Sequence, residues 1–256
     1  IWGDYSNVVG LPVAALYVNM KRCGLIDAGD SHPAASLGSG RIKGVIFDLD
    51  GTLADTLESI AYCGNYAMRS CKLADIPLEK YRYFVGEGAD TLIRRCLIYS
   101  GDEDLKFYEK AYAKYQIIFK EECLFNVTVY PGMLETLQEL KANGIKLAVL
   151  SNKPHERTLD VVYSLFGRDL FDTVLGHRQG IAKKPSPQGV QEILNGWNMD
   201  AKDILFVGDS ATDMITGNAA GATTVGVLWG FRDRAELEKH RAQKIIERPE
   251  ELLELL

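Results

Sequence analysis

The stretch Gly-Val-Ile-Phe-Asp-Leu-Asp-Gly-Thr-Leu, residues 44–53, decides the fold. Residues 45–47 form a short apolar run between a glycine and a glycine-containing turn, which predicts a buried β-strand. Asp48 stands at the carboxyl end of this strand, and Asp50 follows two residues later on the same side of the chain. Gly51 lets the backbone turn and come close to a ligand. The stretch therefore predicts a strand that ends in a pair of carboxylates.

Further strand and helix patterns alternate after this stretch. Three apolar runs predict strands: residues 146–150, 204–207 and 223–227. Hydrophobic residues at a three-to-four spacing predict helices between them: Met133, Leu134, Leu137 and Leu140 in one, and Leu159, Val162 and Leu165 in another. Strands that alternate with helices imply an α/β fold with a doubly wound, Rossmann-like parallel sheet. Such sheets bind ligands at the carboxyl ends of their strands.

One part of the chain breaks this alternation. Residues 56–128 contain no convincing strand, whereas helical patterns cover residues 57–73, 89–98 and 104–120. We expect a helical domain of residues 56–128, inserted after the first strand into a core domain of residues 43–55 and 129–256. Residues 28–42 are small, polar and rich in Gly and Ser, as in a linker. Residues 1–27 are too few to fold alone.

Composition and charge argue against several classes of protein. The chain has 256 residues, a net charge of -6 and no basic tail, which argues against a nucleic-acid partner. No apolar run reaches the ~20 residues of a membrane span, and the charges around residues 8–18 are in the wrong order for a signal peptide. The five cysteines form no C-x-x-C pair, so we expect neither a disulfide framework nor a zinc site, but a cytoplasmic protein.

The pair Asp48 and Asp50 has the residue types of a catalytic dyad. Two carboxylates this close cannot ionise equally well, so their pKa values should split. One can stay charged as nucleophile and metal ligand, while the other holds a proton as general acid. The alternative is a solvated Asp-Gly turn. A calcium loop is disfavoured because Glu is missing at the required position.

Two further motifs offer groups that bind phosphate. Ser151 and Asn152 follow the predicted strand 146–150, where a hydroxyl and backbone N–H groups can hold phosphate oxygens. The alternative is that they cap the helix that starts near Pro154. Lys184 lies in a proline-stiffened loop and could neutralise an attacking carboxylate and the phosphoryl group. Its alternative is a solvated basic turn.

A second pair of carboxylates follows the strand 204–207. Asp209 comes at the strand end, which suits a hard oxygen ligand for Mg²⁺. Asp213, one helical turn later, could orient a metal-bound water or pair with Lys184. It could equally complement the dipole of its helix. Because each of the four motifs follows a predicted strand or lies in its loop, in one parallel sheet, we expect their side chains to converge on one edge.

These motifs resemble, in order, those of the haloacid dehalogenase-like hydrolase superfamily, over about residues 43–256. The resemblance implies that Asp48 is the nucleophile, Asp50 the general acid and base, and that Ser151 and Lys184 hold phosphate. It also implies that Asp48, Asp209 and the backbone carbonyl of Asp50 bind Mg²⁺, and that residues 56–128 form a cap that closes over small substrates. Within the family that the chain resembles, an aspartate at the position of Asp50 implies phosphate chemistry and not dehalogenation. Further candidates for substrate contact are Gly51, Thr52, Asn152 and Gly88.

Within the superfamily, three stretches look like bacterial phosphoglycolate phosphatases: residues 84–90, 151–154 and 225–231. The first is rich in glycine before a helix, so its backbone N–H groups could meet a substrate carboxylate; the alternative is a plain turn. We expect a Mg²⁺-dependent phosphatase that hydrolyses a small phosphate monoester, best 2-phosphoglycolate, through an aspartyl-phosphate. Alternatives are a pyrophosphatase, a sugar-phosphate phosphatase or mutase, or a non-catalytic phosphate-responsive module. No oligomeric state follows from the sequence.

The amino-terminal segment has a resemblance of its own. Residues 3–13 look like the carboxyl end of Maf-type nucleotide pyrophosphatases. The catalytic part of that family is absent, so no second activity is expected. The match and the initial Ile1 are what a shortened fusion or a misjudged gene start would leave.

Overall fold

The structure is a computed structural model that describes residues 42–256. The Maf-like segment expected at residues 1–27, and all but the last residue of the linker expected at 28–42, lie outside the described residues. Within residues 42–256, no helix combines the length and apolar character needed to cross a membrane.

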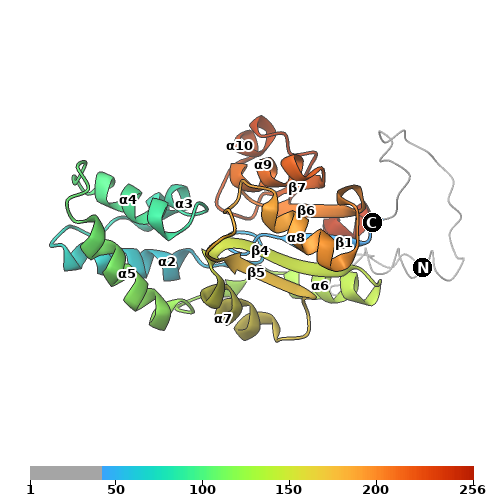
Figure 1. Ribbon diagram of the computed structural model, residues 1–256, viewed down its shortest axis with the longest axis horizontal. Coiled ribbons are helices and arrows are strands. Elements are labelled where there is room, and N and C mark those ends of the chain that lie inside the picture. The colour runs from blue at the N-terminus through green and yellow to red at the C-terminus, as the bar shows by residue number, and fades with distance from the viewer. Residues whose placement is uncertain (1–41) are drawn as a thin grey trace, which may run out of the picture. The chain divides into compact units, whose positions relative to one another are not determined.

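A six-stranded parallel sheet forms the centre of the fold, in the order β5-β4-β1-β6-β7-β8 (Figure 1). The strands are β1 (Gly44–Phe47), β4 (Lys146–Pro154), β5 (Thr173–His177), β6 (Ile204–Gly208), β7 (Thr223–Val227) and β8 (Lys244–Ile246). Central strand β1 pairs on both sides, with Gly44 opposite Lys146 in β4 and opposite Ile204 in β6. The four predicted strands are confirmed, and β5 and β8 were not predicted.

The order of the strands places β1 at the switch point of the sheet. The chain runs from β1 outward to β4 and β5, then returns past β1 to build β6, β7 and β8 on the other side. The connections therefore leave in opposite directions on the two sides of β1. A crevice opens outside the carboxyl ends of the strands at such a point. The doubly wound α/β fold is confirmed.

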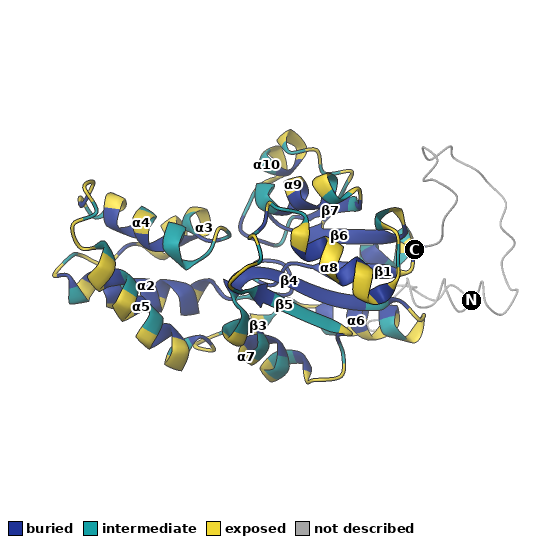
Figure 2. Cartoon of the chain, viewed as in Figure 1, coloured by how far each residue is buried: buried dark blue, intermediate teal, exposed yellow. Residues whose placement is uncertain are grey.

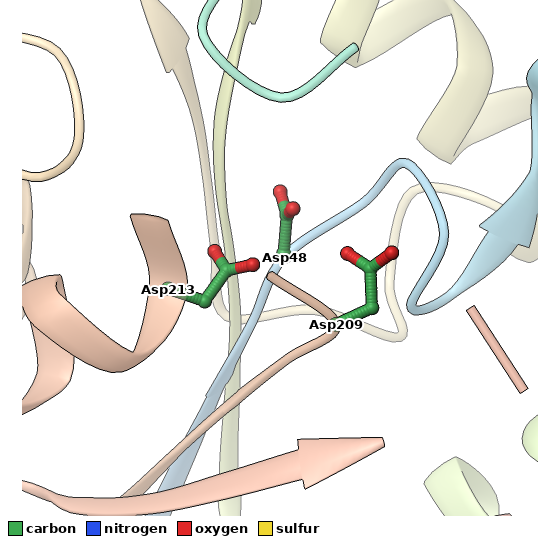
Figure 3. A group of neighbouring side chains, drawn as sticks. All are labelled: Asp48, Asp209 and Asp213. Atoms are coloured by element: carbon green, nitrogen blue, oxygen red, sulfur yellow. The ribbon is translucent and has the colours of Figure 1, made fainter. Parts of the chain in front are cut away.

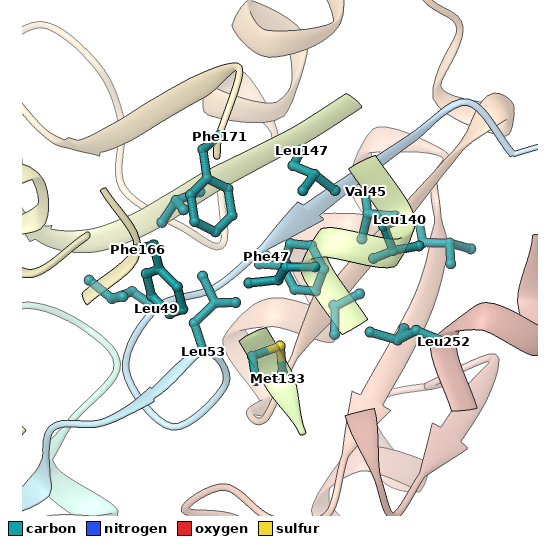
Figure 4. Close-up of a cluster of buried hydrophobic side chains, with 14 of the residues drawn as sticks. Val45, Phe47, Leu49, Leu53, Met133, Leu140, Leu147, Phe166, Phe171 and Leu252 are labelled. Atoms are coloured by element: carbon teal, nitrogen blue, oxygen red, sulfur yellow. The ribbon is translucent and has the colours of Figure 1, made fainter. Parts of the chain in front are cut away.

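Helices cover both faces of the sheet because the strand residues alternate between the faces. On one face, Phe47 packs in a buried cluster with residues of α6 (Met133–Ala142), α7 (His155–Phe166) and the 3-10 helix η2 (Pro249–Leu255) (Figure 4). On the other face, Ile46 packs with residues of α8 (Gln188–Trp197). Helices α9 (Ala211–Ala220) and α10 (Arg234–Lys239) lie on the same side as α8 (Figure 1). Figure 2 shows the inner strands buried between these layers, whereas edge strand β5 is only partly buried.

A separate group of helices lies between β1 and α6 in the chain. They are α2 (Leu57–Ser70), α3 (Leu78–Phe84), α4 (Ala89–Tyr99) and α5 (Tyr108–Glu122), and they enclose a hydrophobic cluster of their own. A short antiparallel pair, β2 (Ala54–Asp55) and β3 (Thr128–Val129), joins this group to the sheet. The three predicted helices are confirmed, and α3 was not predicted.

Several boundaries differ from the prediction, among them the end of α2 at Ser70 instead of residue 73. Thr128 belongs to β3, although residues 56–128 were expected to lack strands. Helix α5 begins at Tyr108 instead of residue 104. The carboxylate of Asp102 accepts hydrogen bonds from the backbone N–H groups of Lys106 and Phe107, which holds the chain in a turn before the helix.

Candidate active site

Three buried carboxylates meet at the switch point of the sheet. Asp48 follows β1, Asp209 follows β6, and Asp213 lies in the first turn of α9. One carboxylate oxygen from each of them lies within 4.8 Å of the others. Figure 3 shows Asp48 and Asp209 side by side, with Asp213 turned toward Asp48. The predicted convergence of these strand ends is therefore observed.

Lys184 joins this cluster from the loop between β5 and α8. Its Nζ lies 2.7 Å from Oδ1 of Asp48 and 2.7 Å from Oδ1 of Asp213. All three side chains are buried. The alternative interpretation of Lys184 as a solvated basic turn is wrong, because its ammonium forms two ion pairs inside the protein.

Burial and mutual repulsion shift the pKa values of these groups. Burial, helped by the carboxylate of Asp213, raises the pKa of Asp48 well above its usual value, although Lys184 opposes this. Burial and Asp213 also raise the pKa of Asp209 to about 7. Burial alone would lower the pKa of Lys184, but Asp213 and Asp48 outweigh burial and raise it. Without further positive charge, the site resists full ionisation of its carboxylates.

The chemistry of these donors fits Mg²⁺. Three buried carboxylates face a single lysine, so the cluster carries excess negative charge that a divalent cation would compensate. Both oxygens of Asp213 are occupied, Oδ1 by Lys184 and Oδ2 by the backbone N–H and hydroxyl of Ser210. Asp213 is thus placed to hold Lys184 and to cap α9, which leaves Asp48 and Asp209 as candidate direct ligands.

Close backbone contacts fix Asp209 beside Asp48. Oδ2 of Asp209 accepts a 2.7 Å hydrogen bond from the backbone N–H of Phe231. A Cβ atom at Gly51 would lie 2.4 Å from the same oxygen, and the φ of Gly51 is +83°. A Cβ at Gly230 would lie 2.3 Å from the Cβ of Asp209. Only glycine fits at these two positions while Asp209 keeps its place.

Asp50 lies outside the carboxylate cluster and has different partners. Its Oδ1 accepts hydrogen bonds of 2.6 Å from Nζ of Lys153 and 2.6 Å from the hydroxyl of Thr56. Sequence reasoning gave Lys153 no role. A signal was available, since Ser151 and Lys153 are two residues apart and would share one side of a strand that continued past Leu150.

Ser151 and Asn152 belong to strand β4, which continues to Pro154. The side chain of Asn152 accepts a hydrogen bond from the backbone N–H of Lys184 and donates to the carbonyls of Lys184 and Gly86. Helix α7 has no side-chain cap, so the alternative that Ser151 or Asn152 caps it is wrong. Asn152 instead ties β4 to the Lys184 loop and to the segment before α4.

A cavity extends from Asp48 toward the helical group. Its core side is lined by Asp48, Asp50, Ser151, Asn152, Lys153 and Pro154. Its other side is lined by Ile60, Val85, Gly86, Gly88, Ala89, Leu92, Tyr115 and Phe119, which come from α2, α4, α5 and the segment before α4. Gly88, a predicted substrate contact, is among these lining residues. Thr52 and Gly51 are not among the lining residues, and the hydroxyl of Thr52 is buried without a hydrogen-bond partner in residues 42–256.

Known proteins share both this sequence and this fold. The family model of haloacid dehalogenase-like hydrolases matches residues 45–227. A phosphoglycolate phosphatase of Haemophilus influenzae is 33% identical over 222 residues, covering 84% of this chain and 99% of the relative. A phosphoglycolate phosphatase of Nitrosospira multiformis is 32% identical over 202 residues, covering 77% and 89%.

Solved structures agree with these relatives. The crystal structure of a predicted phosphoglycolate phosphatase from Haemophilus somnus matches with a TM-score of 0.79 at 27% identity, covering 85% of this chain and 99% of that one. The family match spans Asp48, Lys184 and Asp209, which meet at one buried site. The chain belongs to the haloacid dehalogenase-like hydrolase family.

Proposed function

We propose that the chain is a Mg²⁺-dependent phosphatase that hydrolyses 2-phosphoglycolate through an aspartyl-phosphate on Asp48. The observation that carries the proposal is the position of Lys184, buried between Asp48 and Asp213, whose carboxylates form one cluster with that of Asp209. Curated relatives that cover most of the chain and bear the name phosphoglycolate phosphatase support this substrate.

In the first step, Asp48 attacks the phosphorus of the ester. Its Oδ1 is held by Lys184 and by the backbone N–H of Leu49, and its Oδ2 has no partner in the described chain. Oδ2 forms the new bond to phosphorus while the bond from phosphorus to the ester oxygen breaks. Asp50 gives its proton to that oxygen as glycolate leaves.

In the second step, the aspartyl-phosphate is hydrolysed. Asp50, now a carboxylate, takes a proton from a water molecule whose oxygen bonds to phosphorus. The bond from phosphorus to Asp48 breaks, inorganic phosphate leaves, and the Asp48 carboxylate is restored. Lys184 stays next to the reacting oxygens in both steps and offsets their negative charge.

Three groups of the chain are proposed to hold Mg²⁺: the carboxylates of Asp48 and Asp209 and the backbone carbonyl of Asp50. When bound, the ion would offset the charge of the phosphoryl oxygens in the transition state. Ser151 and Asn152 line the cavity beside Asp48, where they are proposed to bind the phosphoryl group and to hold the Lys184 loop. Residues 56–128 are proposed to act as the cap that excludes water.

Phosphate release from the purified full chain tests this function. Initial rates would be measured with 2-phosphoglycolate, pyrophosphate and glucose 6-phosphate, each with Mg²⁺ and with EDTA. We expect kcat/KM for 2-phosphoglycolate to exceed the others by at least about 10-fold, and EDTA to abolish turnover. A preference for pyrophosphate or the sugar phosphate would contradict the proposed substrate. Full activity in EDTA would contradict the metal.

A further inference from the structure

Lys153 is a buried cation in the cavity that the reaction steps above do not use. Its side chain is 3% exposed, and its Nζ lies 2.6 Å from Oδ1 of Asp50. The Nζ also lies 5.0 Å from the ring centroid of Phe119 in α5, and both residues line the cavity. The ammonium is therefore held next to the proposed general acid and under the helical group.

The ammonium of Lys153 has hydrogen-bonding capacity to spare. A lysine carries three N–H donors, and within residues 42–256 the only acceptor that Nζ reaches is Asp50. The face of Phe119 attracts the charge but accepts no conventional hydrogen bond. A buried ammonium that is not fully bonded is stabilised by any anion that enters the cavity.

Among the described residues, Lys153 is the only cation in the lining of this cavity. Lys183 is not in the lining, but its Nζ would lie 3.0 Å from a Cβ atom at Gly88. The side formed by the helical group is apolar at Ile60, Leu92 and Phe119. Lys184 is absent from the lining and is already paired with two carboxylates. A negative group on the leaving part of the substrate would find its countercharge at Lys153. Gly88 and Ala89, where α4 begins, line the same cavity.

The position of Lys153 also sets how far this negative group lies from the ester oxygen. Asp50 must contact the ester oxygen in order to protonate it. Lys153 binds the same carboxyl group of Asp50. Its ammonium therefore lies about one hydrogen-bond length from the carboxyl group that contacts the ester oxygen. In 2-phosphoglycolate the carboxylate carbon is separated from the ester oxygen by a single carbon atom, which brings the carboxylate to the ammonium.

We propose that Lys153 is the specificity-determining residue that selects phosphate esters with a carboxylate next to the ester-bearing carbon. This inference rests on the proposed phosphatase activity and adds the group that reads the leaving part of the substrate. A purely structural role, in which Lys153 only positions Asp50, would affect all substrates equally.

Two substrates that differ only in this group test the inference. They are 2-phosphoglycolate and 2-hydroxyethyl phosphate, in which a neutral hydroxymethyl group replaces the carboxylate. In Lys153→Met, we expect the ratio of their kcat/KM values to fall about 30-fold or more, with most of the change in the KM for 2-phosphoglycolate. Any effect transmitted through Asp50 reaches both substrates and cancels in this ratio.

Two further variants serve as controls. Lys153→Arg keeps the charge and should retain the ratio to within about 10-fold of the wild-type value. Lys114→Met removes an exposed lysine of the same helix as Phe119 and should leave the ratio unchanged. If Lys153→Met fails to fold, the wild-type enzyme with the carboxyl methyl ester of 2-phosphoglycolate gives the same comparison, and we expect about 30-fold weaker turnover than with the free acid.

The possible failures can be told apart. If the wild-type enzyme hydrolyses 2-phosphoglycolate and the ratio is unchanged in Lys153→Met, the role of Lys153 is refuted while the proposed function stands. If the wild-type enzyme does not hydrolyse 2-phosphoglycolate but does hydrolyse phosphate esters whose leaving part is uncharged, the proposed substrate itself is refuted.

Discussion

Lys184 is buried, and two carboxylates stabilise its ammonium there. Burial of an unpaired charge is costly, and Asp48 and Asp213 together reverse the effect of burial on the pKa of Lys184. The same arrangement holds Oδ1 of Asp48, which is one of the residues that line the cavity. Lys184 therefore connects the stability of the site with the geometry of the proposed nucleophile.

Asp209 couples proton binding to metal binding. Its pKa is raised to about 7 by burial and by Asp213. Because folding raises the pKa of Asp209, its protonated form stabilises the metal-free protein. This contribution is fully present at a pH below the pKa of an unfolded aspartate and is lost as the pH rises through about 7. A bound Mg²⁺ needs the ionised carboxylate, so protons compete with the ion below about pH 7.

We therefore expect a fixed concentration of Mg²⁺ to raise the Tm more at about pH 8 than at about pH 6. The apparent Kd for Mg²⁺ should be about 10-fold weaker at the lower pH, because one proton must be released. Thermal unfolding with and without Mg²⁺ at the two pH values measures this. Asp209→Asn should lose the Mg²⁺ effect at both. An equal rise in Tm at both pH values would remove Asp209 from the proposed ligand set.

Strand β4 is longer than the sequence pattern predicts. The apolar run that predicts the strand ends at Leu150, yet the strand continues to Pro154 with an irregular register. Beyond Leu150 the side chains are polar because they face the site instead of the hydrophobic core. Their partners, such as Lys184 for Asn152 and Asp50 for Lys153, are more than 30 residues away in the chain, so no local pattern indicates them.

Two arginines link the helical group to the sheet. Arg82 of α3 donates a 3.0 Å hydrogen bond to the carbonyl of Gly230, which follows β7. Arg232 donates a 3.0 Å hydrogen bond to the carbonyl of Val85, which follows α3. The two bonds run in opposite directions across the same contact, next to the backbone that holds Asp209. They favour the arrangement in which the helical group covers the cavity.

Arg232→Met should weaken this arrangement. Because fewer molecules would have the cavity covered, we expect the KM for the substrate to rise about 3–10-fold, with a smaller change in kcat. Steady-state kinetics measures both constants. Arg234→Met is the matched control, since Arg234 is exposed and its ion pairs within residues 42–256 are with Glu238 and Glu247. An unchanged KM in Arg232→Met would show that this link does not govern closure.

For the whole molecule, the sequence predicted the inner strands better than the edges. β1, β4, β6 and β7 are covered on both faces. β1, β6 and residues 147–150 of β4 are apolar runs, and β7 consists of small and β-branched residues. The edge strands β5 and β8 are only partly buried and mix polar with apolar residues, which leaves no clear periodicity. The order of the strands in the sheet was likewise not predicted from the sequence, because it depends on contacts between segments that are far apart in the chain.

The carboxylates of the candidate site were predicted because Asp48 and Asp209 each follow a recognisable strand. Asp48 and Asp209 stand directly after buried runs, and parallel strands bring such ends together. Lys184 lies in a loop, and its partners emerge only from the fold. Lys153 was missed because its role depends on Asp50 and on α5, which meet it only in the folded chain.

Chemical trapping of the phosphorylated enzyme tests the role of Asp48 most directly. Turnover with 2-phosphoglycolate and Mg²⁺ would be quenched rapidly, reduced with borohydride and analysed by peptide mass spectrometry. An aspartyl-phosphate is reduced to homoserine, so we expect homoserine at position 48 and at no other aspartate. Reduction at a different aspartate, or complete turnover with Asp48 never modified, would contradict the account.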